Sequence, residues 1–177
     1  EEALYIDNWL IRYKADLAET LYIRKGTHGV ADMNSFQKRY LKGVTFPEGL
    51  KYIGSEAFER TDLKSVKLPG TLELMKYSAF RGTKIKEITL PASMKRVDKW
   101  VFMDCEQLDR ITVEGKDTQI VWPAVTGHHN GTPMIIESPL NSHAQAYCEK
   151  YGKKYNLVFE EKKPVVKNNI FTLRRKK

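Results

Sequence analysis

The side chains in this chain that could do chemistry are two adjacent histidines and two cysteines. His128 and His129 could bind a metal ion together with His143, Glu137 or Cys148. Adjacent histidines point in different directions in most backbones, and the sequence contains neither an HExxH nor a CxxC motif to complete such a site. We therefore interpret the histidine pair as part of a solvated loop and expect no bound metal ion.

The usual motifs of a catalytic centre are also absent from the sequence. A catalytic serine would need an elbow such as GxSxG, and a phosphate site would need a glycine-rich loop. Cys105 could act as a nucleophile only with a distant histidine, and its place in the repeat described next predicts that it is buried. Asn130–Gly131–Thr132 has the form of a glycosylation acceptor, which we interpret as a tight turn. We expect that the protein is not an enzyme and has no cofactor.

The elements that would position any site follow from a repeat of about 22 residues. The segments Pro47–Phe58, Pro69–Phe80 and Pro91–Phe102 share one pattern, in which a proline follows an apolar run and a phenylalanine closes the unit. An LxxLxL motif precedes each unit and forms three columns: Ala18, Leu41, Leu63, Ile85 and Leu108; Leu21, Val44, Val66, Ile88 and Ile111; Ile23, Phe46, Leu68, Leu90 and Val113. The last two columns alternate as in a strand with one face on a core. Proline lacks the N–H that a ladder needs, so it ends the strand.

A single coil of this length cannot bury its own apolar face, so the coils must stack. Stacking aligns the strands into a parallel sheet with a spacing of about 4.8 Å. It also places the phenylalanines in a ladder on the opposite wall. The sequence therefore predicts an α/β solenoid of about five coils, each of about 22–23 residues, with a parallel β-sheet on one face.

The repeat resembles a known family. The phrases LKYIGSEAFERTDLKSVKLPGTL and IKEITLPASMKRVDKWVFMDCEQLDRITV are similar to the LxxIxIPxxVxxIGxxAFxxCxxL pattern of the BspA-like leucine-rich repeats of bacterial surface proteins. SHAQAYCEKYGKKYNLVF resembles the family's closing segment. The resemblance covers about residues 4–159 and implies a leucine-rich-repeat solenoid in an exported, surface-displayed adhesion protein. It also implies a precursor with a signal peptide, which the sequence does not show.

We expect one leucine-rich-repeat domain over residues 1–159, with repeats over 18–113. Residues 1–17 form the N-terminal cap, as two short strands around Asp7–Asn8, with Trp9 and Tyr13 as apolar cover. Residues 114–159 form a decayed repeat and the C-terminal cap.

The C-terminal cap should contain a helix over residues 142–151. Ser142 and Gln145 have capping-box spacing, and Ala144, Tyr147, Cys148 and Tyr151 form one apolar stripe. Gly152 is expected to stop the helix. Pro133–Glu137 is expected as an edge strand, and Asn156–Phe159 as a returning strand.

Charge and cysteine content constrain the class of protein. The net charge is +8, and residues 160–177 contain seven Lys and Arg against Glu160 and Glu161. We interpret them as a basic, flexible tail on an ordinary body, without the basic face of a nucleic-acid reader. No run of apolar residues is long enough to span a membrane. Cys105 and Cys148 are expected to be buried free thiols, although a bridge between them stays open.

A binding function must then use the exposed side of the strands. Two outward columns alternate with the core columns, and we select from them the candidate binding residues Tyr22, Thr45, Lys67, Thr89, Arg110 and Thr112. We expect a monomeric interaction or adhesion module that binds a protein or another surface macromolecule outside the cell or at its surface. The alternatives are a structural spacer that presents another domain and an anionic-polymer binder that uses the basic tail. The small polar residues of these columns also fit an ordinary exposed sheet face, which is the plainer interpretation.

Overall fold

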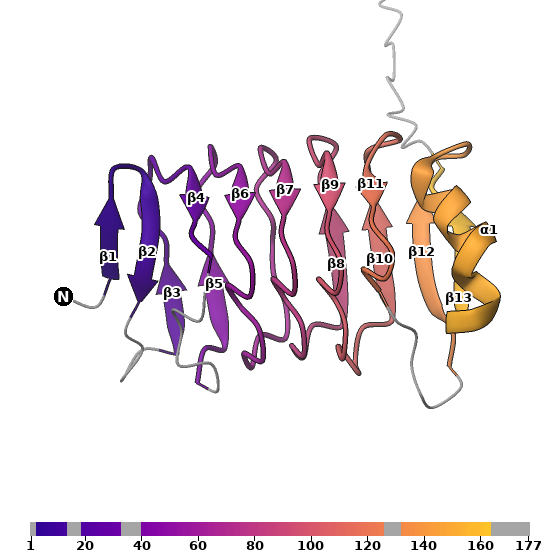
Figure 1. The fold of residues 1–177 in the computed structure, drawn as a ribbon, viewed down its shortest axis with the longest axis horizontal. Coiled ribbons are helices and arrows are strands. Elements are labelled where there is room, and N and C mark those ends of the chain that lie inside the picture. The colour runs from indigo at the N-terminus through magenta and orange to yellow at the C-terminus, as the bar shows by residue number, and fades with distance from the viewer. Residues whose placement is uncertain (1–2, 14–18, 33–39, 126–131, 164–177) are drawn as a thin grey trace, which may run out of the picture.

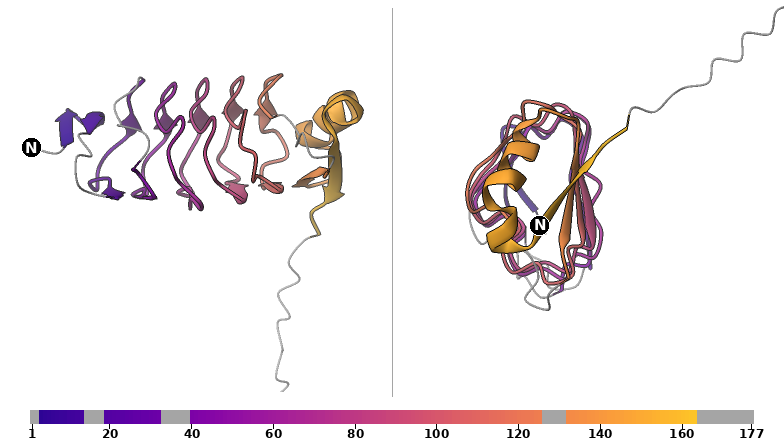
Figure 2. Two further views of the ribbon diagram at one scale, coloured as in Figure 1. Left: turned by 90° about the horizontal axis from the view of Figure 1, so that it is seen from below. Right: turned by 90° about the vertical axis from the view of Figure 1, so that its right-hand side faces the viewer.

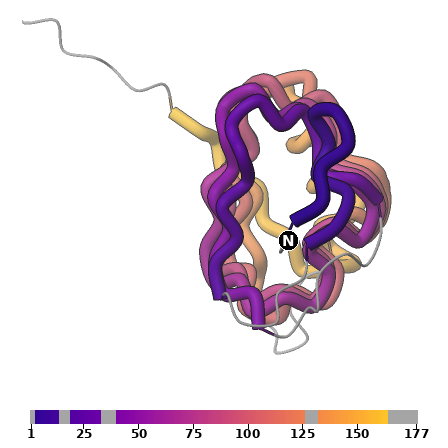
Figure 3. Tube along the Cα trace, turned by 90° about the vertical axis from the view of Figure 1, so that its left-hand side faces the viewer, coloured from indigo at the N-terminus to yellow at the C-terminus, as the bar shows by residue number. Residues whose placement is uncertain are grey.

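The protein is a solenoid whose coils stand side by side along its longest axis (Figure 1). The structure, a computed structural model, describes residues 3–13, 19–32, 40–125 and 132–163. Ala18, the pair His128–His129, the Asn130–Gly131 turn and residues 164–177 of the expected tail lie outside these ranges. Seen from its N-terminal end, each coil is a flattened ring with two long walls, and successive rings overlay one another (Figure 3). The predicted solenoid of stacked coils is therefore confirmed.

One wall is a seven-stranded sheet of very short strands. In spatial order these are β1 (Ala3–Ile6), β2 (Trp9–Tyr13), β4 (Gly29–Val30), β6 (Tyr52–Ile53), β7 (Leu74–Met75), β9 (Arg96–Val97) and β11 (Gln119–Ile120). The strands β1 and β2 form an antiparallel hairpin, as expected around Asp7–Asn8, and every later pair in this sheet is parallel. The hairpin therefore closes the N-terminal end of this wall.

The LxxLxL segments form the opposite wall, but not as the one continuous sheet that the repeat predicts. A two-stranded sheet contains β3 (Thr20–Tyr22) and β5 (Gly43–Thr45), and a four-stranded sheet contains β8 (Glu87–Leu90), β10 (Arg110–Val113), β12 (Met134–Ser138) and β13 (Leu157–Glu161). Between these sheets, the leg at residues 65–68 is not a strand. The backbone bond from Lys86 N–H to the Lys64 carbonyl is long, at 3.4 Å, so coupling to the next coil is weak there.

The strand predicted at Pro133–Glu137 is present as β12, but it is not an edge strand. It pairs in parallel with β10 on one side and with β13 on the other. The returning strand is also longer than expected, because Glu160 and Glu161 pair with Glu137 and Ser138 of β12. These two glutamates therefore belong to the sheet rather than to a tail.

The corners of successive coils repeat the same backbone geometry. Glu56, Ser78 and Trp100 occupy equivalent positions with left-handed φ values of 57°, 53° and 63°. Their N–H groups donate to carbonyls of the next coil, from Glu56 to Tyr77 at 2.8 Å and from Trp100 to Pro123 at 2.7 Å. Non-glycine residues adopt this conformation at a cost. The hydrogen bonds between coils therefore hold a corner that the residue types alone disfavour.

The C-terminal end is closed by the helix α1 (His143–Tyr155), which lies across the last coil (Figure 2). One half of the expected capping box is present, since the Ser142 hydroxyl accepts from Gln145 N–H at 3.1 Å. The Gln145 side chain instead accepts from the N–H of Asn141, the residue before the N-cap, at 2.8 Å. The predicted apolar stripe is buried at Ala144, Tyr147 and Cys148 and half-buried at Tyr151. The cap therefore covers the end of the core.

The predicted helix stop at Gly152 is wrong. The helix continues to Tyr155 and ends at Asn156, which has a left-handed φ of 52° and donates its N–H to the Gly152 carbonyl. Gly152 is instead required by close packing, because a Cβ at this position would lie 2.7 Å from the Leu157 carbonyl oxygen. Asparagine is the residue type that replaces glycine most readily at a left-handed helix end.

Candidate interaction surface

The exposed-face residues selected from the sequence lie on the wall that contains β3, β5, β8 and β10. They are Tyr22, Thr45, Lys67, Thr89, Arg110 and Thr112. The register pairs Tyr22 with Thr45 and Thr89 with Thr112. Tyr22 is 75% exposed. Thr45, Lys67 and Thr89 are also exposed, whereas Arg110 and Thr112 are half-buried. The break between the two sheets separates Tyr22 and Thr45 from the others.

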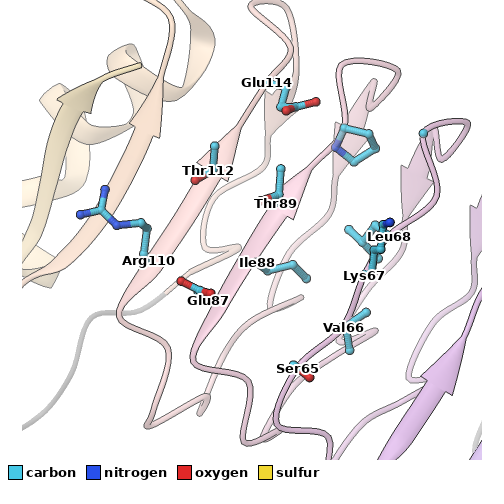
Figure 4. Close-up of a pocket in the computed structure, with 12 residues that line it drawn as sticks. Ser65, Val66, Lys67, Leu68, Glu87, Ile88, Thr89, Arg110, Thr112 and Glu114 are labelled. Atoms are coloured by element: carbon cyan, nitrogen blue, oxygen red, sulfur yellow. The ribbon is translucent and has the colours of Figure 1, made fainter. Parts of the chain in front are cut away.

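A hollow of about 470 Å³ opens on this wall beside the break (Figure 4). Residues 65–68 line one side of it, and β8 and β10 line the other. Four of the selected residues line it: Lys67, Thr89, Arg110 and Thr112. The half-buried Val66 supplies apolar surface, Ile88 lies buried beneath the hollow, and Glu87 and Glu114 supply carboxylates. The hollow is thus a shallow, mixed polar and apolar depression on a rigid sheet.

Arg110 is already held by two carboxylates. Its Nη1 lies 2.7 Å from Glu160 Oε2 and 3.3 Å from Glu137 Oε2. The hydrogen bond to Glu160 is the main reason that the pKa of Arg110 lies above its ordinary value. Thr112 Oγ1 also donates to Glu137, at 3.4 Å. We selected Arg110 as a candidate binding residue, but the extended β13 brings Glu160 beside it and compensates its charge.

Lys67 lines the same hollow but differs from Arg110 in its contacts. It is exposed, and among the residues that the structure describes no ion pair to Lys67 is present. Glu87 faces the hollow from β8 without such a pair in this part of the chain (Figure 4). Charges that have no partner among the described residues are available to a partner from outside. Lys67 and Glu87 are therefore the better candidates for polar recognition here.

A comparison with known protein families agrees with this architecture. The BspA type leucine rich repeat region, in six copies, matches residues 31–150. The chain belongs to this BspA-type family. The matched range extends to residue 150 and so includes much of the stretch over residues 114–159 that we expected as a decayed repeat and C-terminal cap.

Solved structures show the same fold. A leucine rich cell surface protein from Faecalibacterium prausnitzii matches with a TM-score of 0.60 and 21% identity, over 93% of this chain and 41% of that one. The pneumococcal vaccine antigen PcpA matches with a TM-score of 0.62 and 22% identity, over 89% of this chain and 45% of that one. The chain therefore spans less than half the length of these two proteins. A comparison with curated proteins found no match.

The two thiols of this BspA-type domain are buried and free. Cys105 is buried, as predicted, at the same place in its coil as the buried Thr61 and Thr83, and its Sγ donates to the Phe80 carbonyl at 3.2 Å. Burial raises the pKa of Cys105, and it raises the pKa of Cys148 to about 12. Because the thiolate is the nucleophile, neither thiol is suited to covalent chemistry at neutral pH.

Of the possible metal ligands considered from the sequence, His143, Glu137 and Cys148 lie in the described ranges, and these three do not form a common site. His143 lies at the start of α1 with its Nδ1 3.2 Å from the Asp117 carbonyl, whereas Glu137 is paired with Arg110. Within the described ranges, no group of three His, Cys, Asp or Glu side chains could hold a metal ion. Nor is any helix of the described part long and apolar enough to cross a membrane.

Sequence reasoning named Trp9 as apolar cover but missed the aromatic contacts between coils along the return leg. Trp9 stacks on Tyr52 with ring centroids 5.8 Å apart, and Tyr77 lies 5.0 Å from Trp100. Trp122 stacks on Tyr151 of α1 at 4.2 Å. The available signal was the spacing of Tyr77, Trp100 and Trp122, which recur about one coil apart on the return leg.

Proposed function

We propose that this BspA-type domain is a non-catalytic protein-interaction or adhesion module of an exported bacterial surface protein. Its partner is a protein or another surface macromolecule, which contacts the wall of β5, β8 and β10. Solenoids offer extended, rigid faces for such contacts. Surface display is supported by the family and by the printed description of the F. prausnitzii structure as a cell surface protein.

The observation that carries the proposal is the hollow at the sheet break. It combines apolar surface from the half-buried Val66 with charges at Lys67 and Glu87 that have no described partner. Interfaces typically combine an apolar centre with a polar rim, and that mixture is present at this hollow. Exposed aromatic anchors are not part of its lining, so the affinity of this domain alone should be modest.

The test is a binding screen of the chain against purified matrix and cell-surface proteins, followed by variants of the hollow. Lys67→Glu reverses a charge on its edge, and Thr89→Arg fills it with a long side chain. Each should weaken binding by at least about tenfold, since misplaced charge and bulk both oppose docking. Lys99→Glu is the matched control, because Lys99 is exposed on the return leg. If a partner found in the screen binds the parent chain, Lys67→Glu and Thr89→Arg with equal affinity, the hollow is excluded as its binding site.

A structural spacer remains the second candidate, and the compensation of Arg110 by Glu137 and Glu160 favours it. A wall whose charges are neutralised internally offers little to a polar partner. A screen without any binder would support this alternative.

A further inference from the structure

Trp9 lies on the outer face of the seven-stranded sheet, where 38% of its surface is exposed. The register places Trp9 beside Gly29, and Gly29 beside Tyr52. A Cβ on Gly29 would overlap the Trp9 ring, so the glycine leaves the space in which this ring lies. The ring lies over β4 and stacks on Tyr52, with the two planes 8° from parallel. The two rings thus form one aromatic platform that spans β2, β4 and β6.

A hollow of about 320 Å³ lies at this platform. Trp9 and Tyr52 give it aromatic surface, and the exposed residues Asp7, Asn8 and His28 complete its lining. Within the described ranges, no hydrogen bond or ion pair engages the side chains of these three polar residues. Their carboxylate, amide and imidazole groups are therefore available to a ligand that rests on the two rings.

Backbone hydrogen bonds fix the three coils that supply these groups. His28 N–H donates to the Asn8 carbonyl at 2.7 Å, and the His28 carbonyl accepts from Tyr52 N–H at 3.3 Å. Arg24 Nη2 donates to the Asp7 carbonyl at 3.1 Å, which ties the turn between β1 and β2 to the next coil. The hollow is therefore built on connected strands. A site that is already ordered loses less entropy when it binds a ligand.

We propose that this hollow binds a neutral pyranose ring of a glycan. A pyranose presents C–H groups on its faces and hydroxyl groups around its rim. The C–H groups match the apolar faces of Trp9 and Tyr52, and the hydroxyl groups match Asp7, Asn8 and His28. Small-molecule sites typically combine aromatic surface with a few polar groups in this way.

The geometry favours a neutral sugar over the two charged ligands that such a hollow suggests. A quaternary ammonium group binds among aromatic faces that leave space for it, whereas Trp9 and Tyr52 stack on each other with centroids 5.8 Å apart. The carboxylate of Asp7 opposes an acidic sugar by charge repulsion. The site uses the outer face of β2 and β6, so it does not depend on the hollow at the sheet break.

The probes are cellobiose and lactose, with sorbitol as a polyol that has no ring and choline as the cation. NMR titration of the full chain should give a Kd on the order of 1 mM for at least one disaccharide, as for a small ligand on a shallow site. Sorbitol and choline should bind at least about tenfold more weakly. Binding of neither disaccharide would overturn the proposal, and so would sorbitol or choline binding as tightly as the better disaccharide.

Two aromatic variants separate this hollow from general aromatic exposure. Trp9→Ala should weaken disaccharide binding at least about tenfold. Tyr77→Ala is the matched control and should leave binding within about twofold. Tyr77 is 37% exposed and also lines a hollow on the return leg, but there Arg96 and Asp98 already pair with each other at 2.6 Å. Equal losses in both variants, or no loss in Trp9→Ala, would overturn the proposal.

Gly29→Ala tests the platform without removing any group that contacts the sugar. Its methyl group should displace the Trp9 ring and weaken disaccharide binding about tenfold, with circular dichroism as the check that the chain still folds. Unchanged binding in a folded Gly29→Ala variant would show that the stacked rings are not the site. Lys67→Glu should not change disaccharide binding, so a failure here leaves the proposed function of the hollow at the sheet break untouched.

Discussion

The Phe58 and Phe80 rings stack across adjacent coils with their centroids 5.2 Å apart and their planes 14° from parallel. Phe102 continues this ladder 6.1 Å from Phe80, and all three side chains are almost completely buried. The contact at one equivalent position of each coil is what the repeat register predicted. The packing of Phe80, the central ring of the three, therefore depends on both neighbouring coils.

Phe80→Ala should therefore destabilise the domain by about 3–5 kcal/mol, through lost burial and the cavity left between two rings. Denaturant unfolding followed by circular dichroism measures the change. Tyr22→Ala is the matched control, because Tyr22 is 75% exposed and its loss should cost less than about 0.5 kcal/mol. A melting temperature unchanged by Phe80→Ala would contradict the ladder.

Gly152→Ala should destabilise the C-terminal cap although alanine is the better helix former. Alanine favours a helix by about 1 kcal/mol over glycine, but its Cβ would lie 2.7 Å from the Leu157 carbonyl oxygen. We expect a net loss of about 1–3 kcal/mol in the free energy of unfolding, because the start of β13 must shift. Lys153→Ala, at the next and exposed position, should be close to neutral. A stabilised Gly152→Ala variant would show that Leu157 can move freely.

The stacked coils could be predicted because apolar periodicity reports burial directly. Leu63, Ile85 and Leu108 occupy one column in the sequence and one buried column in the structure. The break at residues 65–68 could not be predicted, because Val66 and Leu68 keep the same apolar pattern as their neighbours. Side-chain periodicity does not report whether adjacent backbones form a hydrogen-bonded ladder.

The candidate surface was less predictable than the core. The sequence selected Lys67 and Thr89, and the structure places both at one hollow. The sequence did not reveal that Glu160 compensates the charge of Arg110. This contact joins a residue of the repeat to a residue of the cap 50 positions later. Contacts between a repeat and its cap have no period, so a single sequence contains no signal for them.

The buried thiols predict a specific alkaline response. The pKa of Cys148 is raised from 9.0 to about 12, mainly by burial, so the native state keeps a proton that the unfolded chain loses above about pH 9. This contribution to stability is present below pH 9 and is lost as the pH rises towards 12. Urea unfolding at several pH values in this range measures the decrease.

Cys148→Ala is the comparison for this response and should show a shallower loss of stability with pH than the parent chain. The Cys148 and Cys105 thiols should also react with an aromatic disulfide reagent only after unfolding. Rapid reaction of either thiol in the native protein, or equal alkaline slopes for the parent and Cys148→Ala, would contradict the burial of these groups.

Arg110 and Glu160 should be coupled, but only weakly. The pair is 2.7 Å apart, yet the Arg110 side chain is 34% exposed and that of Glu160 is 46% exposed. Exposed ion pairs typically contribute about 0.2–1 kcal/mol and weaken as salt screens them. A double-mutant cycle of Arg110→Ala and Glu160→Ala should therefore give a coupling energy in that range at low salt and less at high salt.

Glu161→Ala is the matched control, because neighbouring strand residues point to opposite faces, and its coupling to Arg110 should be near zero. Zero coupling with Glu160 at low salt would mean that β13 does not compensate Arg110, which would return Arg110 to the residues available for a partner.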